Sequence, residues 1–210
     1  LNAYNALIIN PLYDFEESQL SLKKKTQIVN DLNAIADAAK LDNTIEVKFH
    51  SSKTIGPNAF AFPAGPILIT DELVLTLNQN EIIAILAHEV AHIEERHSLQ
   101  QFIRLAGLTT ISALIFDGIF ISDLLADTAV IGLFLKSSRD LERDADISAL
   151  NYLDIINVDK KHLLFAMENI LKCPKEEELK ENCDQDNQLS WLSTHPSPED
   201  RLEYLRFATQ

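Results

Sequence analysis

Residues 84–98, AILAHEVAHIEERHS, constrain the chain more than any other stretch, because His88, Glu89 and His92 form the pattern H-E-x-x-H. Residues four apart share one face of an α-helix, so His88 and His92 can direct imidazole nitrogens to one point about 2.0 to 2.1 Å away, the Zn–N distance. Glu89 lies about 100° around the helix, beside that point. It is therefore placed to take a proton from a metal-bound water and not to be a third ligand.

Two interpretations of this helix stay open at this point. A chance match to the pattern is expected roughly 0.01 times in a chain of this kind, so a metal site is favoured over a helix with merely satisfied surface histidines. One large class of such enzymes needs a third histidine where this chain has Ser98, and that class is excluded. His97 projects about 180° from His88 on a helix. It is expected to be a solvent or packing histidine and not a ligand, and Glu94 and Glu95 are likewise expected to stand outside the site.

A catalytic zinc ion needs three protein ligands and one open position, so another segment must supply the third ligand. Residues 137–150, SSRDLERDADISAL, predict a second helix with apolar Leu141, Ala145, Ile147 and Leu150 among many charges. Glu142 and Asp146 are four apart and share a face of it. One can bind the metal while the other accepts a hydrogen bond from a ligand histidine. A solvated charged face is the alternative.

A third polar segment is LSTHPSPEDRLEYL, residues 192–205. Ser197 as N-cap with Pro198 at the first helical position predicts a helix start. His195 lies just before it, on a loop that Pro196 and Pro198 hold stiff. His195 could donate a hydrogen bond to the oxyanion of a tetrahedral intermediate, and Arg201 could support it. The alternative is an ordinary capped surface helix.

The remaining pattern predicts an α+β fold that is mostly helical, with a small mixed or antiparallel sheet. Helical spacing of Ile28, Leu32, Ile35 and Ala39 predicts a helix over about 18–40. Alternation in TIEVKFH, residues 44–50, indicates a half-buried strand, and NAFAFPAGPILIT, residues 58–70, contains two short extended pieces. From Asp71 onward the pattern is helical, with Asn80 as the expected N-cap of the H-E-x-x-H helix.

Composition narrows the function classes. At 210 residues and 46% hydrophobic, the chain is expected to form one domain, residues 1–210. Its net charge of −14 argues against nucleic acid and anionic membrane surfaces as partners. Because the chain opens at Leu1 and its only methionine is Met167, we expect an upstream segment, with a signal peptide as one candidate. Cys173 and Cys183 could form a disulfide in an oxidising compartment or stay as free thiols.

Residues 105–135 are the most apolar part of the chain and are expected to form a helical insert between the two site helices. The longest uncharged run, residues 105–116, is shorter than the roughly 20 residues needed to span a bilayer. A buried helical hairpin is favoured. A surface that rests on a membrane or covers the active site is the alternative.

With these segments assembled, the chain resembles the HtpX-like and CAAX-prenyl-endopeptidase group of zinc metallopeptidases (metallopeptidase family 48). Within that group it is most similar to small periplasmic members related to the β-barrel assembly-enhancing protease. The resemblance rests on four signatures in the family's order: PNAFAFPAGPILIT (57–70), EIIAILAHEVAHIEERH (81–97), SRDLERDADISAL (138–150) and STHPSPEDRL (193–202). It implies a gluzincin-type domain, and we expect a minimal catalytic domain without the membrane spans of some relatives or the helical repeats of others.

The resemblance also implies residue roles. The implied ligands of one Zn²⁺ per chain are His88, His92 and Glu142, and the implied general base is Glu89. Asp146 is implied to be the hydrogen-bond partner of a ligand, and His195 with Arg201 to line the active site. In some relatives the histidine at the place of His195 can approach the zinc and hold the enzyme inactive. The backbone of Asn58, Ala59, Phe60 and Ala61, or the strand near 67–70, is implied to pair with an extended substrate. Plain core sheet is the alternative.

These observations predict a zinc-dependent endopeptidase that hydrolyses peptide bonds in unfolded or misassembled envelope proteins. The expected compartment is the bacterial periplasm, and peripheral association with a membrane stays open. Two alternatives differ in class: a latent or chaperone-like protein-binding module that keeps the zinc, and a protein whose zinc is purely structural.

Overall fold

The structure is a computed structural model that describes residues 14–62, 66–101, 139–171, 195 and 198–209. The predicted apolar insert 105–135 lies outside these residues, as do Cys173 and Cys183.

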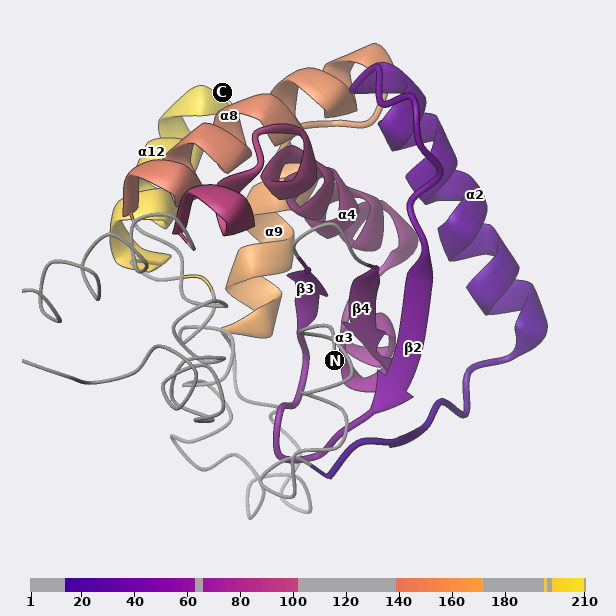
Figure 1. Cartoon of the computed structure of the whole chain (residues 1–210). Helices are drawn as coiled ribbons and strands as arrows, with labels where there is room; N and C mark the ends of the chain where they lie inside the picture. The colour runs from indigo at the N-terminus through magenta and orange to yellow at the C-terminus, as the bar shows by residue number, and fades with distance from the viewer. Residues whose placement is uncertain (1–13, 63–65, 102–138, 172–194, 196–197, 210) are drawn as a thin grey trace, which may run out of the picture.

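Ten elements follow one another along the described chain (Figure 1). They are β1 (Glu16–Glu17), α2 (Leu22–Ala38), β2 (Val47–Ser51), β3 (Ala59–Ala61), β4 (Ile67–Thr70), α3 (Asp71–Thr76), α4 (Gln79–Glu94), α8 (Arg139–Ile155), α9 (Lys161–Ile170) and α12 (Pro198–Ala208). The predicted α+β class, mostly helical with a small sheet, is confirmed.

The sheet is mixed and has the strand order β1-β2-β4-β3. β2 and β4 run parallel, with Val47 opposite Ile67, whereas β3 pairs with β4 antiparallel, with Ala59 opposite Ile69. The side chains of Ile67 and Ile69 are fully buried, as expected for a strand flanked on both sides. β3 is the outer strand of the described sheet on the side of the H-E-x-x-H helix.

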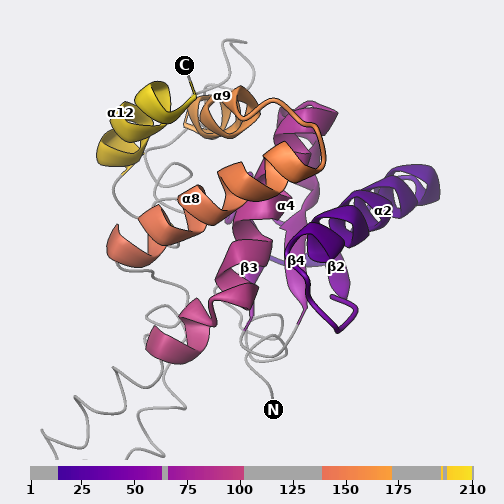
Figure 2. The same ribbon diagram turned by 90° about the horizontal axis from the view of Figure 1, so that it is seen from above.

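Helix α4, which carries the H-E-x-x-H pattern, lies at the centre of the described fold. It contacts β3 of the sheet and the helices α2, α8 and α9, and Figure 2 shows α8 passing across it. All residues from Glu81 to His92 are buried. A helix that is apolar on nearly every face has to be enclosed in this way. The polar groups of His88, Glu89 and His92 are therefore held inside the protein.

The start of α4 differs from the prediction. The N-cap is Asn78, whose side chain accepts from the Glu81 N–H, while the Glu81 carboxylate accepts from the Asn78 N–H. This reciprocal capping box satisfies two backbone donors. Asn80 was wrong as the cap because the helix begins two residues earlier and Asn80 already lies in its first turn.

The other predicted helices are found with small shifts. α2 is capped by the Ser21 side chain and buries Ile28, Leu32 and Ile35. α12 begins at Pro198, the predicted first helical position. The prediction for α8 is wrong in one detail: it counted Ile147 with the apolar face, but Ile147 is 42% exposed. In the described part of the chain, no helix combines the length and hydropathy that crossing a bilayer requires.

Candidate metal centre

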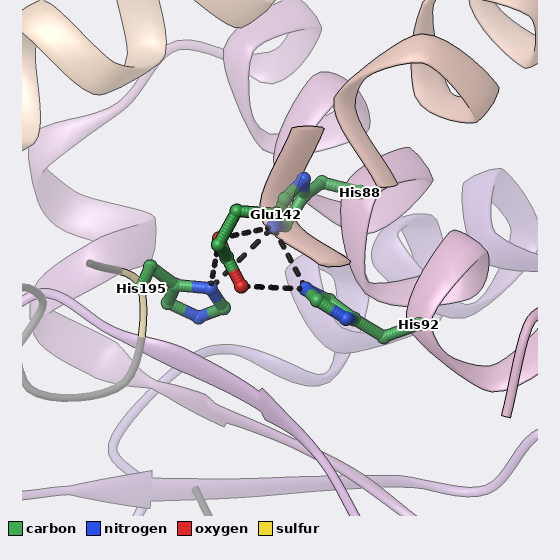
Figure 3. A group of neighbouring side chains, drawn as sticks. All are labelled: His88, His92, Glu142 and His195. Atoms are coloured by element: carbon green, nitrogen blue, oxygen red, sulfur yellow. Dashed lines mark hydrogen bonds and ion pairs between the residues drawn. The ribbon is translucent and has the colours of Figure 1, made fainter. Parts of the chain in front are cut away.

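Four side chains from three segments converge at the contact between α4 and α8 (Figure 3). His88 and His92 come from α4, Glu142 from α8, and His195 from the segment just before α12. All four are buried, and one nitrogen or oxygen of each lies within 4.8 Å of the others. Sequence reasoning predicted the first three as ligands and placed His195 in the active site, and the structure brings them together.

The spacing of the donor atoms matches ligands of a single ion. His88 Nε2 lies 3.0 Å from His92 Nε2. Each histidine Nε2 lies 3.3 Å from an oxygen of Glu142, Oε2 for His88 and Oε1 for His92. Ligand atoms of a tetrahedral ion with bonds of 2.0–2.1 Å are about 3.3–3.4 Å apart. Only small shifts would be needed for all three groups to bind one metal ion.

The weakly satisfied carboxylate oxygens and the charge of the site point to the same conclusion. Among the described residues, Glu89 Oε1 and Glu142 Oε1 are buried and make no well-formed hydrogen bond; they only face His195 and His92 at 3.5 and 3.3 Å, which leaves ionised groups incompletely satisfied. The site also buries Asp146 and Arg201. Three carboxylates and one guanidinium leave two negative charges when the histidines are neutral, so a divalent cation would balance them. The residues present therefore fit a metal ion.

Asp146 and Arg201 contact the ligand side chains of His88 and Glu142. His88 Nδ1 lies 3.0 Å from Asp146 Oδ1, so the nitrogen that faces away from Glu142 has a carboxylate partner. Arg201 donates to both oxygens of Asp146, at 2.8 and 2.6 Å, and to Glu142 Oε2 at 2.6 Å. Bidentate charge-assisted bonds of this kind fix orientation. The structure thus places Arg201 against the carboxylates, whereas sequence reasoning gave it the role of supporting His195.

These contacts set the ionisation of the two carboxylates. Burial alone would raise the pKa of Glu142, but Arg201 and the neighbouring histidines outweigh it and hold that pKa well below its usual range. Burial likewise opposes ionisation of Asp146, yet Arg201 and His88 lower its pKa. Both groups are therefore ionised near neutral pH, as metal ligands and their hydrogen-bond partners must be.

The two ligand histidines have different electrostatic surroundings. Burial lowers the pKa of His92 to about 3, against the opposing effect of Glu142. For His88, burial and Arg201 also favour the neutral ring, but Asp146 and Glu142 raise its pKa to about 9. His92 is therefore neutral and ready to bind, whereas a metal ion has to displace a proton from His88.

Glu89 stands beside the ligand group, as its position on the helix predicted. Oε1 of Glu89 lies 3.5 Å from His195 Nε2. Burial raises the pKa of Glu89, and the nearby His195 and His88 only partly offset this. A carboxylate whose pKa is shifted upward toward neutrality is better suited to accept and return a proton.

His195 lies close to the ligands, a position that the family resemblance allows for the histidine at this place. Its Nδ1 lies 3.1 Å from Glu142 Oε2 and 3.4 Å from His88 Nε2, which makes it a fourth donor in the group. On its other side, Nε2 lies 3.4 Å from the carbonyl oxygen of Ala59 in β3. His195 therefore connects the candidate metal centre to the edge of the sheet.

His97 lies outside the ligand group, as predicted, but it packs against one of the ligands. It is 2% exposed and its Nδ1 lies 2.9 Å from His92 Nδ1. The predicted direction away from His88 assumed a helix that continues to residue 97, but α4 ends at Glu94 and Arg96 adopts a left-handed φ of 55°. The chain turns there, so the angular projection fails. Glu94 and Glu95 are exposed, as expected.

The predicted substrate segment, residues 58–61, borders the site. Phe62 N–H donates to Pro66 O and Thr70 N–H donates to Asn58 O, so the residues on either side of β3 direct these main-chain groups toward β4 and its flanks. By the alternation of an antiparallel ladder, Ala59 and Ala61 direct their main-chain groups away from β4. Those groups meet side chains: Ala59 N–H donates to Asn58 Oδ1, and Ser98 Oγ donates to the Ala61 carbonyl at 3.2 Å.

This fold and site define the chain as a metallopeptidase domain: it matches Peptidase family M48 over residues 22–209 and belongs to that family. The mitochondrial metalloendopeptidase OMA1 of Saccharomyces cerevisiae is 23% identical over 192 residues, which are 88% of this chain and 54% of that protein. The beta-barrel assembly-enhancing protease of Yersinia pestis is 27% identical over 203 residues, 86% of this chain and 38% of that protein. The chain thus spans about half the length, or less, of these curated relatives.

Among solved structures, the crystal structure of S. mikatae Ste24p matches with a TM-score of 0.50 at 19% identity. The match covers 97% of this chain and 55% of that one. At this identity the likeness shows the fold alone. It agrees with the predicted metallopeptidase fold.

Proposed function

We propose that the chain is a zinc-dependent endopeptidase that cleaves protein or peptide substrates. The observation that supports this most directly is the buried group of His88, His92 and Glu142, with the buried carboxylate of Glu89 beside it. Two histidines and a glutamate are a ligand set of catalytic zinc in peptidases. Zinc bound there would act as a Lewis acid on the substrate carbonyl and lower the pKa of its water.

The remaining residues supply proton transfer and orientation. Glu89 accepts a proton from the attacking water and returns it to the leaving amine, which its raised pKa favours. His195, 3.5 Å from Glu89, donates a hydrogen bond to the developing oxyanion through Nε2. Arg201 acts indirectly, because its bonds to Asp146 and Glu142 fix the ligand carboxylate and the partner of His88.

The substrate is proposed to bind as an extended strand along β3, which is the β-augmentation mode of peptide recognition. Of the predicted residues Asn58, Ala59, Phe60 and Ala61, only Ala59 and Ala61 present main-chain groups to the outer edge. A substrate strand would replace the side chains of Asn58, Ser98 and His195 that now contact these groups. The pairing would bring a scissile carbonyl toward the metal centre and Glu89.

We propose unfolded or misassembled envelope proteins as the substrates, with the bacterial periplasm as the compartment. The support is the similarity to a beta-barrel assembly-enhancing protease. Peripheral attachment to a membrane is compatible with these substrates and with this compartment. Family membership does not favour the alternative of a latent or chaperone-like binding module.

The test compares the wild type with Glu89→Gln, which keeps the shape of the side chain and removes the base. The variant should bind one zinc ion per chain as the wild type does, while cleavage of casein falls by at least the 10²–10⁴-fold that general acid–base catalysis contributes. Metal content is read by mass spectrometry of the native protein. Undiminished cleavage by Glu89→Gln, or a wild type that binds zinc and cleaves nothing, would contradict the proposal.

A further inference from the structure

His97 occupies a buried position that the proposed reaction does not use. Its ring lies against that of His92, with the ring centroids 5.0 Å apart and the planes at 73°. The Nδ1 atoms of the two rings are 2.9 Å apart, which is a good hydrogen-bond distance. The other nitrogen of His92, Nε2, faces His88 and Glu142. His97 therefore contacts His92 on the side opposite the ligand group.

The end of α4 places His97 there. The Glu95 N–H donates to Ala91 O, the Arg96 N–H donates to Ile93 O, and Arg96 then takes a left-handed φ of 55°. A new helical turn starts at His97, with the Gln100 N–H donating to Arg96 O. The left-handed conformation of Arg96 costs free energy for a residue other than glycine. It changes the direction of the chain, so that the ring of His97 packs against the ring of His92.

The proton positions in this pair follow from the role of His92. A neutral imidazole that binds a metal through Nε2 has its proton on Nδ1, and that N–H is a donor. The atom facing it, His97 Nδ1, must then be the acceptor, so the proton of His97 sits on Nε2. Such a bond fixes both the tautomer and the ring orientation of a ligand histidine.

We propose that His97 is a positioning residue that holds His92 in its metal-binding tautomer and orientation. The inference rests on the proposed zinc site. It gives each ligand histidine its own partner: His88 is held by the carboxylate of Asp146, 3.0 Å from its Nδ1, and His92 by the neutral ring of His97. A neutral acceptor adds less basicity than a carboxylate. The two histidine ligands are thereby inequivalent.

Two substitutions separate positioning from packing. His97→Leu fills similar space but cannot accept a hydrogen bond, whereas His97→Asn puts an oxygen at the place of Nδ1 and restores the acceptor. The zinc dissociation constant, measured by competition with a chromophoric chelator, should rise 10–100-fold for His97→Leu, the usual effect of losing a ligand's hydrogen-bond partner. His97→Asn should stay within a few-fold of the wild type.

His162→Leu is the matched control, because His162 lies on α9 outside the ligand group and bonds Asn80. Its zinc affinity should equal that of the wild type, and the thermal transitions of the metal-free variants report folding separately. Unchanged affinity in His97→Leu, or an equal loss in His97→Leu and His97→Asn, would overturn the proposal. Since the readout is zinc affinity, a wild type that binds zinc without cleaving casein would refute the proposed function and leave this inference standing.

Discussion

Arg201 offers the sharpest test of how the centre is held together. Its guanidinium makes three bonds of 2.6 to 2.8 Å to Asp146 and Glu142, and all three side chains are buried. Arg201→Met keeps most of the length and apolar volume of the side chain but removes the charge. Two ionised carboxylates then lose their shared counter-ion in a buried setting.

The expected loss follows from that geometry. Removing one partner of a buried ion pair costs about 3–5 kcal/mol, because the other partner is left uncompensated. We expect the free energy of unfolding of the zinc-loaded protein, measured by urea denaturation, to fall by that amount in Arg201→Met. The free energy of unfolding of Arg201→Lys should lie between those of the wild type and Arg201→Met, since a lysine restores the charge but not the bidentate geometry.

Arg206→Met is the control on the same helix. Arg206 is 58% exposed and pairs with Glu168 at 3.1 Å, and such surface pairs contribute about 0–1 kcal/mol. The reasoning is refuted if Arg201→Met and Arg206→Met lower the free energy of unfolding equally. The same result would mean that Asp146 and Glu142 are stabilised by something other than Arg201.

Two further predictions concern the metal. Asp146→Asn should raise the zinc dissociation constant, measured by isothermal titration, about 10–100-fold, because His88 loses its charged partner. Asp144 is exposed on the same helix, so Asp144→Asn should leave the constant unchanged. Equal affinities of the two variants would count against Asp146 as the partner of His88. Zinc at 100 times its dissociation constant should stabilise the fold by about 2.7 kcal/mol. Chelation should therefore lower the calorimetric transition temperature, and coinciding transitions with and without chelator would disprove the linkage.

The sequence predicted the features that depend on local spacing. The helix over about 18–40, the strand pieces in 44–70 and the start of α12 at Pro198 follow from periodicity and capping residues, and each has its counterpart in the structure. For His88 and His92 the spacing on one helix is sufficient. Assigning Glu142 and not Asp146 to the ligand group required the family resemblance, because both carboxylates lie on the same face of α8.

The features that sequence reasoning missed depend on contacts between distant segments or on a single backbone angle. No glycine marks the left-handed turn at Arg96, so nothing in the sequence signals that His97 turns back toward His92. The direction of Arg201 depends on where α12 docks on α8. β1 contains only Glu16 and Glu17, which have low strand propensity, and its pairing with Ser51 and His50 comes from the sheet.

The route of Arg201 into the centre has a consequence for synthesis. His88 and Arg201 are 113 residues apart in the sequence, and a ribosome that has delivered α4 and α8 has already made every proposed zinc ligand. The counter-charge for Glu142 and Asp146 arrives only with α12. A nascent chain thus contains all three proposed ligands before it contains Arg201. The bonds of Arg201 to Glu142 and Asp146 can form only after α12 has been made and has docked.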